Sequence, residues 1–399
     1  MQINLLEDAW EADVPHDQFM YLRRNHPVFW HDVPGDSGFW AVTKYQDVKA
    51  ISRDAQTWST ELGTTFIRTQ TPEFIEIASL TLLNMDPPKQ SRYRRLVSAG
   101  FTPKTIAKLA ATVQTRAERI ADAVRDRDEV EFVTDVAEYL PLQMICDLIG
   151  VPEADHHLIF DWSNRMVGFQ DPDFRTTPED GEIAAAEIFA YCDALVDDRR
   201  QNPRDDILTA LVNAEVDGDR LTREEIDSFF VILCVAGNET TRNLIAHAMR
   251  ALIAHPDAYR ELRANLADEV LWRSATEEFL RWGSSIHNFR RTATRDTTLR
   301  GQAIAAGEKV VTFYASANYD EEVFAAPNTF DIHRTPNDHV TFGGGGPHFC
   351  LGANLARLQI TCMIRELVRR FPSAEHTGPV RRMRSDFING IKHMPVRFH

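Results

Sequence analysis

The string FGGGGPHFCLGANLAR, residues 342–357, constrains the fold more than any other part of the chain. Its four glycines carry no Cβ, so the backbone can pass close to a flat ligand. Cys350 lies at or just before the start of a predicted helix from about Leu351 to Phe371, where the helix dipole stabilises a thiolate. Gly352 leaves the far side of the sulfur open. A phosphate-binding loop is excluded because no Gly-Lys-Ser/Thr follows the glycines. The structural alternative is a glycine-rich turn with a buried cysteine.

Amphipathic periodicity predicts that helices dominate the rest of the chain. Apolar residues recur at three- and four-residue spacing over most of the segment from about Pro103 to Pro203, and a further helix is expected near Ala275 to Trp282. Short strands are expected within Phe39 to Val48 and Lys309 to Tyr314, and Asn389-Gly390 is a hairpin signal. The predicted fold class is therefore mainly α with small β-sheets.

A long helix is predicted to cross the centre of the protein. Thr222, followed three residues later by Glu225, forms a capping box that opens it, and the helical pattern continues to about Pro256. Residues 229–237 are apolar on every face, which is typical of a fully buried helix. At 1.5 Å per residue this helix would span roughly 50 Å.

The bulk composition narrows the classes of protein that fit. Lys and Arg number 44 against 59 Asp and Glu, and the resulting net charge of −15 argues against nucleic-acid binding. The sequence shows no linker, repeat or targeting segment and no membrane anchor, so we expect one domain over 1–399 in a cytoplasmic monomer. Four cysteines in apolar helical stretches are expected to be buried without disulfides or zinc: Cys146, Cys192, Cys234 and Cys362.

Polar residues interrupt the apolar centre of the long helix at Ala236-Gly237-Asn238-Glu239-Thr240. Because buried polar groups without partners cost about 1–3 kcal/mol each, they need a reason. In one interpretation Thr240 bonds back to the carbonyl of Ala236 and bends the helix slightly. In the other, a helix loosened at Gly237 accommodates dioxygen, and the adjacent acid and hydroxyl relay protons to it.

A second polar pair, Glu278 and Arg281, is spaced to share one face of a helix. Taken alone, such a pair is usually a solvated surface pair worth about 0–1 kcal/mol.

Together these motifs resemble the cytochrome P-450 superfamily. The family pattern Phe-Gly-x-Gly-x-His-x-Cys-x-Gly, followed by Leu-Ala-Arg, matches the glycine-rich string, with Cys350 at the axial thiolate position. Phe342 lies eight residues before Cys350, whereas the common spacing is seven. The extra glycine is similar to a variant in actinobacterial sterol and methyl-branched-lipid hydroxylases. Further departures are Gly283-Ser284-Ser285, where relatives often have proline, and Asn318-Tyr319-Asp320 in place of Asn-Arg-Asp.

The resemblance implies a cytochrome P-450 fold with a β-rich N-terminal region and a set of site residues. Cys350 would ligate the iron of haem b, and a thiolate ligand favours O–O cleavage. Glu239 and Thr240 would deliver protons, and Glu278, Arg281 and Arg334 would form a buried structural triad. Gln90 occupies a position where the family often has His. Its side-chain amide can donate a hydrogen bond but carries no charge. The residues implied as haem or oxygen contacts are Gln90, Arg94, Ala236, Gly237, Arg291, Phe342, His348 and Gly352. The residues expected at the substrate are Phe66, Leu83, Val235, Ile286, Asn288 and Ile388.

The implied activity is insertion of one oxygen atom from dioxygen into an apolar small molecule such as a steroid, a terpenoid or a fatty-acid-like lipid. Electrons would come from NAD(P)H through a ferredoxin reductase and a ferredoxin. Arg92, Arg95 and Arg357 are either contacts for that ferredoxin or solvated surface side chains. Two alternatives are a peroxide-dependent haem-thiolate enzyme, which would not need Glu239 and Thr240, and a non-catalytic haem sensor or carrier.

Overall fold

The computed structural model describes residues 2–167, 178–216 and 218–399. Its contacts divide the chain into two compact units. The first unit contains Met1–Ser91, His247–Cys350 and Arg381–Lys392, and the second contains Arg92–Ala246, Leu351–Val380 and His393–His399. Because each unit collects three separate segments, no single cut in the sequence separates them. A single domain over 1–399 stays a prediction.

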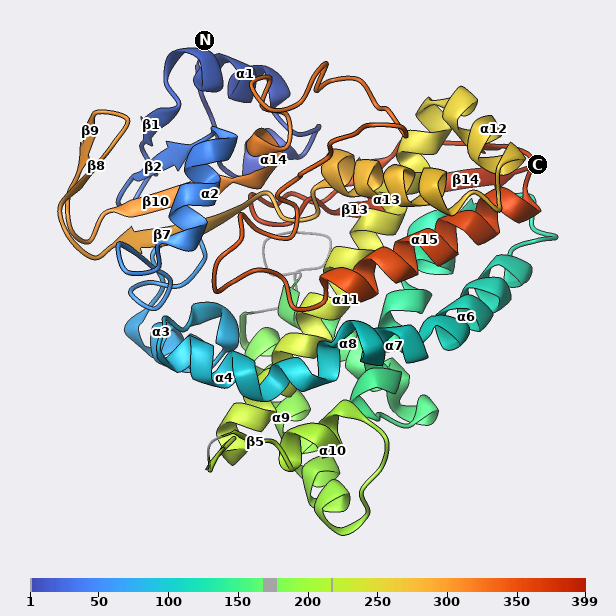
Figure 1. The fold of residues 1–399 in the computed structure, drawn as a ribbon, viewed down its shortest axis with the longest axis horizontal. Helices are drawn as coiled ribbons and strands as arrows, with labels where there is room; N and C mark the ends of the chain where they lie inside the picture. Colours follow the sequence, from blue (N-terminus) through green and yellow to red (C-terminus); the bar gives the residue numbers. More distant parts are fainter. Residues whose placement is uncertain (1, 168–177, 217) are drawn as a thin grey trace. The chain divides into compact units, whose positions relative to one another are not determined.

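A five-stranded sheet with strand order β1-β2-β10-β7-β3 organises the first unit (Figure 1). Strand β10 runs parallel to β2 and antiparallel to β7, so strands from the two ends of the chain lie side by side. Alternate residues of β10 enter different cores: Val310 packs with Tyr45 and Phe324, whereas Val311 packs with Trp10 and Phe19. The sheet is therefore buried on both faces. Its strands are β1 (Val28–His31), β2 (Phe39–Val42), β3 (Trp58–Ser59), β7 (Asn288–Ala293) and β10 (Lys309–Phe313).

Short helices and hairpins complete the first unit. Its helices are α1 (His16–Asn25), α2 (Tyr45–Arg53), α3 (Pro72–Ala78), α12 (Pro256–Ala264), α13 (Glu269–Gly283) and α14 (Tyr314–Ala317). Its 3-10 turns are η1 (Glu7–Trp10) and η2 (Leu82–Asn84). Its two-stranded pairs are β8 (Thr297–Leu299) with β9 (Gln302–Ile304), and β12 (Arg381–Arg382) with β13 (Ile391–His393).

The second unit is mostly helical. Its long C-terminal helix α15 packs on α6 and α7, and α8 packs on α9. Its helices are α5 (Pro103–Lys108), α6 (Ala110–Ala123), α7 (Tyr139–Ile149), α8 (His156–Val167), α9 (Pro178–Gln201), α10 (Ile207–Val212) and α15 (Ala353–Arg370), with the shorter turns η3 (Ser98–Phe101), η4 (Val133–Ala137) and η5 (Glu153–Asp155). Its strands are β4 (Val130–Glu131), β11 (Ala374–His376) and β14 (Pro395–Phe398) in one sheet, and β5 (Glu215–Val216) with β6 (Asp219–Arg220). Helices α4 (Lys89–Val97) and α11 (Arg223–Ala254) each contribute to both units.

Much of the predicted helical pattern is confirmed. The capping box at the start of α11 is present in both directions, because the Thr222 N–H donates to the Glu225 carboxylate (2.9 Å) and the Glu225 N–H donates to the Thr222 hydroxyl (3.2 Å). The helical stretch between Pro103 and Pro203 is observed, interrupted by β4, with 168–177 outside the described residues. Cys146, Cys192 and Cys234 are buried as expected, and Cys362 is half-buried. Within the described part of the chain, no helix is both long enough and apolar enough for a membrane crossing.

The structure sets the bounds of three local predictions. The strand expected over Phe39 to Val48 ends at Val42, because the Asp320 carboxylate accepts the Tyr45 N–H (2.9 Å) and helix α2 begins there. The strand expected over Lys309 to Tyr314 ends one residue early for α14. The hairpin signal of Asn389-Gly390 is confirmed: these residues end the loop that joins the short paired strands β12 and β13. Gly390 is needed there because a Cβ would come within 2.2 Å of the Met383 sulfur.

Candidate haem-thiolate site

Cys350 ends the glycine-rich loop of the first unit, two residues before Gly352, the N-cap of α15. Its backbone N–H donates to the carbonyl of Phe342 (2.9 Å), which closes the loop on itself. Cys350 is exposed, unlike the three buried cysteines of the helical unit. A Cβ built on Gly352 meets no atom of the described residues within 4 Å, so the space beside that residue is open. Phe342 is buried, with its ring 5.9 Å from that of His339.

Two glycines of this loop, Gly344 and Gly346, pack closely against helix α2, which gives them a role besides the predicted approach to a flat ligand. A Cβ on Gly346 would lie 2.3 Å from the carbonyl oxygen of Ser52, and one on Gly344 would lie 2.7 Å from the Ser52 hydroxyl. Gly343, Gly345 and Gly346 also have φ values of 99°, 91° and 76°, a region that L side chains rarely adopt. The missing Cβ atoms therefore let the loop pack against α2 and turn toward Cys350.

Two of the predicted haem contacts hold the loop in place. The side-chain amide of Gln90, which is 1% exposed, donates to the carbonyl of Pro347 (2.7 Å). The His348 Nε2 lies 3.4 Å from the hydroxyl of Thr60, which in turn donates to the Asp86 carboxylate (2.9 Å). Gln90 thus fixes the backbone at the residue directly before His348. Arg94 is half-buried, four residues further along α4.

Arg291 is a buried cation without a carboxylate partner. Its side chain is 4% exposed, its Nη1 donates to the Arg290 carbonyl (2.9 Å), and no carboxylate of the described residues lies within ion-pair distance. Burial lowers the pKa of Arg291, because the charged guanidinium loses its hydration. A buried charge of this kind is expected to have an anionic partner.

The middle of α11 presents an accessible stripe, which corrects the expectation of a helix buried on every face. Ala236 is exposed, and Ile232 and Thr240, four residues to either side, are half-buried. Residues spaced by four share one face of a helix. The helix is continuous at Gly237, and a Cβ on this residue would lie 2.3 Å from the side chain of Ile145 in α7. Val235 is half-buried beside the stripe.

Thr240 makes the hydrogen bond of the structural interpretation. Its hydroxyl donates to the Ala236 carbonyl (2.8 Å). The hydroxyl hydrogen is thereby committed to the helix, while the oxygen retains lone pairs that can accept a hydrogen bond on the accessible face. Both interpretations of Thr240 are compatible with this geometry.

Glu239 is buried in a polar cluster that the sequence does not reveal. Its carboxylate accepts from Arg242 Nη2 (2.6 Å), and Arg242 Nη1 lies 3.7 Å from Glu138, which comes from the junction of η4 and α7. Among the described residues, Glu239 Oε1 and the side-chain amide of Asn238 have no hydrogen-bond partner. The i, i+3 spacing of Glu239 and Arg242 was visible in the sequence, but the third member, a hundred residues away, was not.

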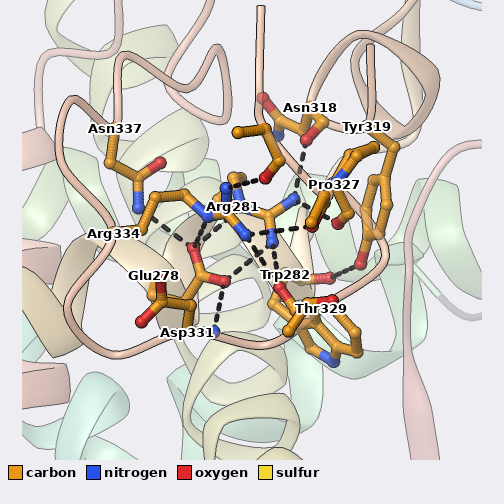
Figure 2. A network of polar contacts seen from close by, with 12 residues as sticks. Glu278, Arg281, Trp282, Asn318, Tyr319, Pro327, Thr329, Asp331, Arg334 and Asn337 are labelled. Atoms are coloured by element: carbon orange, nitrogen blue, oxygen red, sulfur yellow. Dashed lines mark hydrogen bonds and ion pairs between the residues drawn. The ribbon is translucent and has the colours of Figure 1, made fainter. Parts of the chain in front are cut away.

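The predicted triad meets in the first unit (Figure 2). Glu278 accepts from Arg281 through Nε (2.8 Å) and Nη2 (2.7 Å) and from Arg334 Nε (3.1 Å). Glu278 and Arg281 are fully buried and Arg334 is 8% exposed. The remaining guanidinium N–H groups donate to carbonyls of the loop at 325–329, for example from Arg281 Nη1 to Pro327 (3.0 Å). The triad therefore ties that loop to helix α13.

Residues outside the family motif complete this network. The Asp331 N–H (2.9 Å) and the Asn337 side-chain amide (3.1 Å) also donate to Glu278. Tyr319, which replaces the family's Arg, lies with its ring 5.1 Å from the Arg281 guanidinium carbon and donates its hydroxyl to the Trp282 carbonyl (3.0 Å). Ser284, in a left-handed conformation after α13, accepts from Asn318 (2.6 Å).

The expected substrate residues of the first unit come from three separate segments of the chain. The structure brings Ile286, Asn288 and Ile388 close together. Ile286 and Ile388 form a β-bridge, and the Asn288 amide donates to the Asp386 carbonyl (2.6 Å). Phe66 reaches the same strand end through the ring of Phe387, at a centroid distance of 5.1 Å. Sequence reasoning missed Phe387. Leu83 lies in η2, half-buried.

The residues present fit haem. An accessible thiol is the ligand that the iron needs, and Arg291 offers an unpaired buried cation for a propionate carboxylate. On the accessible stripe of α11, Ala236 and Thr240 present small side chains.

Comparisons with known proteins agree with this chemistry. The family model described as Cytochrome P-450 matches residues 158–394. A methyl-branched lipid omega-hydroxylase of Mycobacterium bovis is 45% identical over 401 residues, covering 98% of this chain and 92% of the relative. A steroid C-26-monooxygenase of Rhodococcus jostii is 40% identical over 400 residues, covering 98% and 83%. The solved structure of a Mycobacterium marinum cytochrome P-450 in complex with pseudoionone has a TM-score of 0.92 at 38% identity and covers 100% of this chain and 99% of that one. The chain therefore belongs to the cytochrome P-450 family and is a haem-thiolate monooxygenase.

Proposed function

We propose that this monooxygenase hydroxylates an extended apolar molecule of the steroid or methyl-branched lipid class. The observation that carries the proposal is an aromatic cluster built from three distant segments. Phe387 packs against Phe66 (5.1 Å) and Phe289 (5.4 Å), next to the Ile286–Ile388 bridge. Such a surface binds a molecule by apolar contact and shape. The relatives named for a steroid and for a methyl-branched lipid support the same substrate class.

In this proposal each polar residue has one task. Haem, when bound, supplies the oxygen chemistry, and the protein supplies orientation, charge and protons. Cys350 would hold the iron, and Arg291 with His348 would bind the propionates. Thr240 accepts a hydrogen bond at the accessible stripe while its own hydrogen stays on Ala236. Glu239, with one oxygen unpartnered among the described residues, takes up and releases a proton next to it.

A ferredoxin, reduced by an NAD(P)H-dependent reductase, is the proposed electron donor, and the enzyme would act as a cytoplasmic monomer. Basic residues of α2 border the loop of Cys350: a Cβ on Gly345 would lie 3.0 Å from Arg53 Nε, and one on Gly344 would lie 2.9 Å from Lys49 Cα. Phe349, next to Cys350, is 39% exposed. Arg92 is a weaker docking candidate, because Asp219 (2.8 Å) and Glu225 already bind its guanidinium.

Spectral titration of the haem-loaded enzyme tests the substrate class. A steroid with an aliphatic side chain and a methyl-branched fatty acid should displace the Soret band at lower concentration than an unbranched fatty acid of equal length. Phe66→Ala should weaken binding of the preferred ligand by at least about tenfold, because removing this half-buried ring forfeits at least about 1.5 kcal/mol of apolar contact. Tyr21→Ala, on the exposed surface of α1, should leave the affinity unchanged.

Turnover separates the proposal from its alternatives. Product should form with NADH, reductase and ferredoxin and carry oxygen from labelled dioxygen. Product formed only with peroxide would instead identify a peroxide-dependent enzyme. Tight ligand binding without any product would identify a haem carrier. Equal affinity for all apolar ligands, unaffected by Phe66→Ala, would contradict the assigned substrate surface.

A further inference from the structure

Two buried carboxylates share one guanidinium within the second unit. Arg242 Nη2 donates to Glu239 Oε2 at 2.6 Å, and Arg242 Nη1 lies 3.7 Å from Glu138 Oε2. Glu239 is 3% exposed, Arg242 4% and Glu138 8%. The arginine therefore pairs closely with Glu239 and only loosely with Glu138. Of the two acids, Glu138 is the one closer to solvent.

Charge balance in this cluster favours one bound proton. Two ionised carboxylates and one guanidinium leave a net charge of −1 in a buried site, and such a charge is costly when unpaired. Because Arg242 already neutralises Glu239, the proton belongs on Glu138. Burial, with Glu239 adding to it and Arg242 opposing it, raises the pKa of Glu138 to about 7.

The acidic residues within η4 and α7 pair with other arginines. Asp135 of η4 pairs with Arg127 (2.7 Å), and Asp147 of α7 pairs with Arg116 (2.8 Å). The charges that act on Glu138 thus come from α11, through Arg242 and Glu239.

We propose that Glu138 is the proton reservoir for Glu239, with Arg242 as the switch between the two carboxylates. When Glu138 holds the proton, Arg242 pairs with Glu239. When Glu138 is ionised, Arg242 turns to it and Glu239 takes the proton, which it can pass toward Thr240. One proton enters from solvent at Glu138 for each proton that leaves at Glu239, so charge and atoms balance. The inference rests on the proposed role of Glu239 and Thr240, and it makes Glu138 a positioning residue outside the oxygen site.

Infrared difference spectra of the haem-loaded enzyme between pH 5 and 9 test the inference directly. The wild type should show a protonated buried carboxyl band that disappears with a midpoint near 7. Glu138→Gln should abolish this band. Glu366→Gln is the matched control, because Glu366 is also a buried glutamate bound to arginines of the same unit, including Arg369 (2.7 Å). The control should keep the band.

Turnover gives a second measurement. Glu138→Gln should lower the rate of product formation by about tenfold at pH 7 with unchanged substrate affinity, and it should remove the pH dependence near neutrality. Glu138→Asp keeps an acid at the site with a shorter side chain. It should retain the band with a displaced midpoint, which provides the test if Glu138→Gln does not fold.

Three outcomes would overturn the inference: no titrating band in the wild type, a band that survives Glu138→Gln, or identical midpoints in the wild type and Glu138→Asp. Failure of the proposed function looks different. Glu239→Gln would then support full product formation, whereas the band assigned to Glu138 would still be lost in Glu138→Gln.

Discussion

Glu278 shows how one residue can hold a buried cluster of charge together. It lies at 0% exposure and accepts five hydrogen bonds, two from Arg281 and one each from Arg334, Asp331 and Asn337. Removing ions from water is expensive, and the cost is recovered only where every donor and acceptor is satisfied. Backbone carbonyls of residues 325–329 accept hydrogen bonds from guanidinium N–H groups of Arg281 and Arg334 that do not donate to Glu278. The triad therefore stabilises the folded structure of the first unit.

Glu278→Gln should destabilise the protein by about 3–5 kcal/mol, because two buried guanidinium groups lose their only carboxylate within the triad. Chemical denaturation followed by circular dichroism measures the change. Glu261→Gln is the control, since its carboxylate pairs with His333 on the surface (2.7 Å), where such pairs contribute about 0–1 kcal/mol. Equal effects of the two substitutions would show that the buried network does not stabilise the fold.

At the scale of elements, the loop that carries Cys350 is shaped by helix α2. The sequence reveals the loop, the cysteine and the following helix, because glycine runs and helical periodicity are local signals. It does not reveal that Gly344 and Gly346 face Ser52, because that contact joins segments nearly 300 residues apart. The same limit applies to α11, whose capping box is local and was predicted, whereas its contact with Glu138 was not. Long-range packing decides what a local motif is used for.

Gly346→Ala should therefore destabilise the loop of Cys350 by more than the cost of a left-handed backbone alone. Both Gly346 (φ 76°) and Gly301 (φ 81°) have left-handed backbones, but a Cβ on Gly301 meets no described atom within 4 Å, whereas one on Gly346 would lie 2.3 Å from a carbonyl oxygen. Gly301→Ala, the control, should cost about 1–2 kcal/mol from conformation only. Gly346→Ala should cost more and reduce the thiolate-type Soret band of the reduced, carbon-monoxide-bound protein. An unchanged spectrum and equal stability losses would contradict the packing argument.

For the molecule as a whole, acid stability depends on buried histidines of the first unit. Burial lowers the pKa of His16 to about 4 and that of His247 to about 3, and it places the pKa of His287 well below 6.5. His287 packs its ring 3.9 Å from that of Trp10, and neither of its ring nitrogens has a hydrogen-bond partner among the described residues. These histidines stay neutral in the folded chain at pH values where they are protonated in the unfolded chain.

The sign of the pH effect follows from proton counting. Below pH 6.5 these histidines are protonated in the unfolded chain but stay neutral in the folded chain. The free energy of unfolding therefore falls as the pH is lowered toward the folded-state pKa values. At pH 5, a pKa of about 4 for His16 or about 3 for His247 corresponds to a loss of about 2 kcal/mol for each of these two residues. His287→Phe should remove one such contribution without breaking a hydrogen bond. Denaturation at pH 7 and pH 5 should show a smaller loss of stability for His287→Phe than for the wild type. His333→Gln, at an exposed position, should behave as the wild type. A variant that loses as much stability as the wild type between these pH values would show that His287 does not govern acid sensitivity.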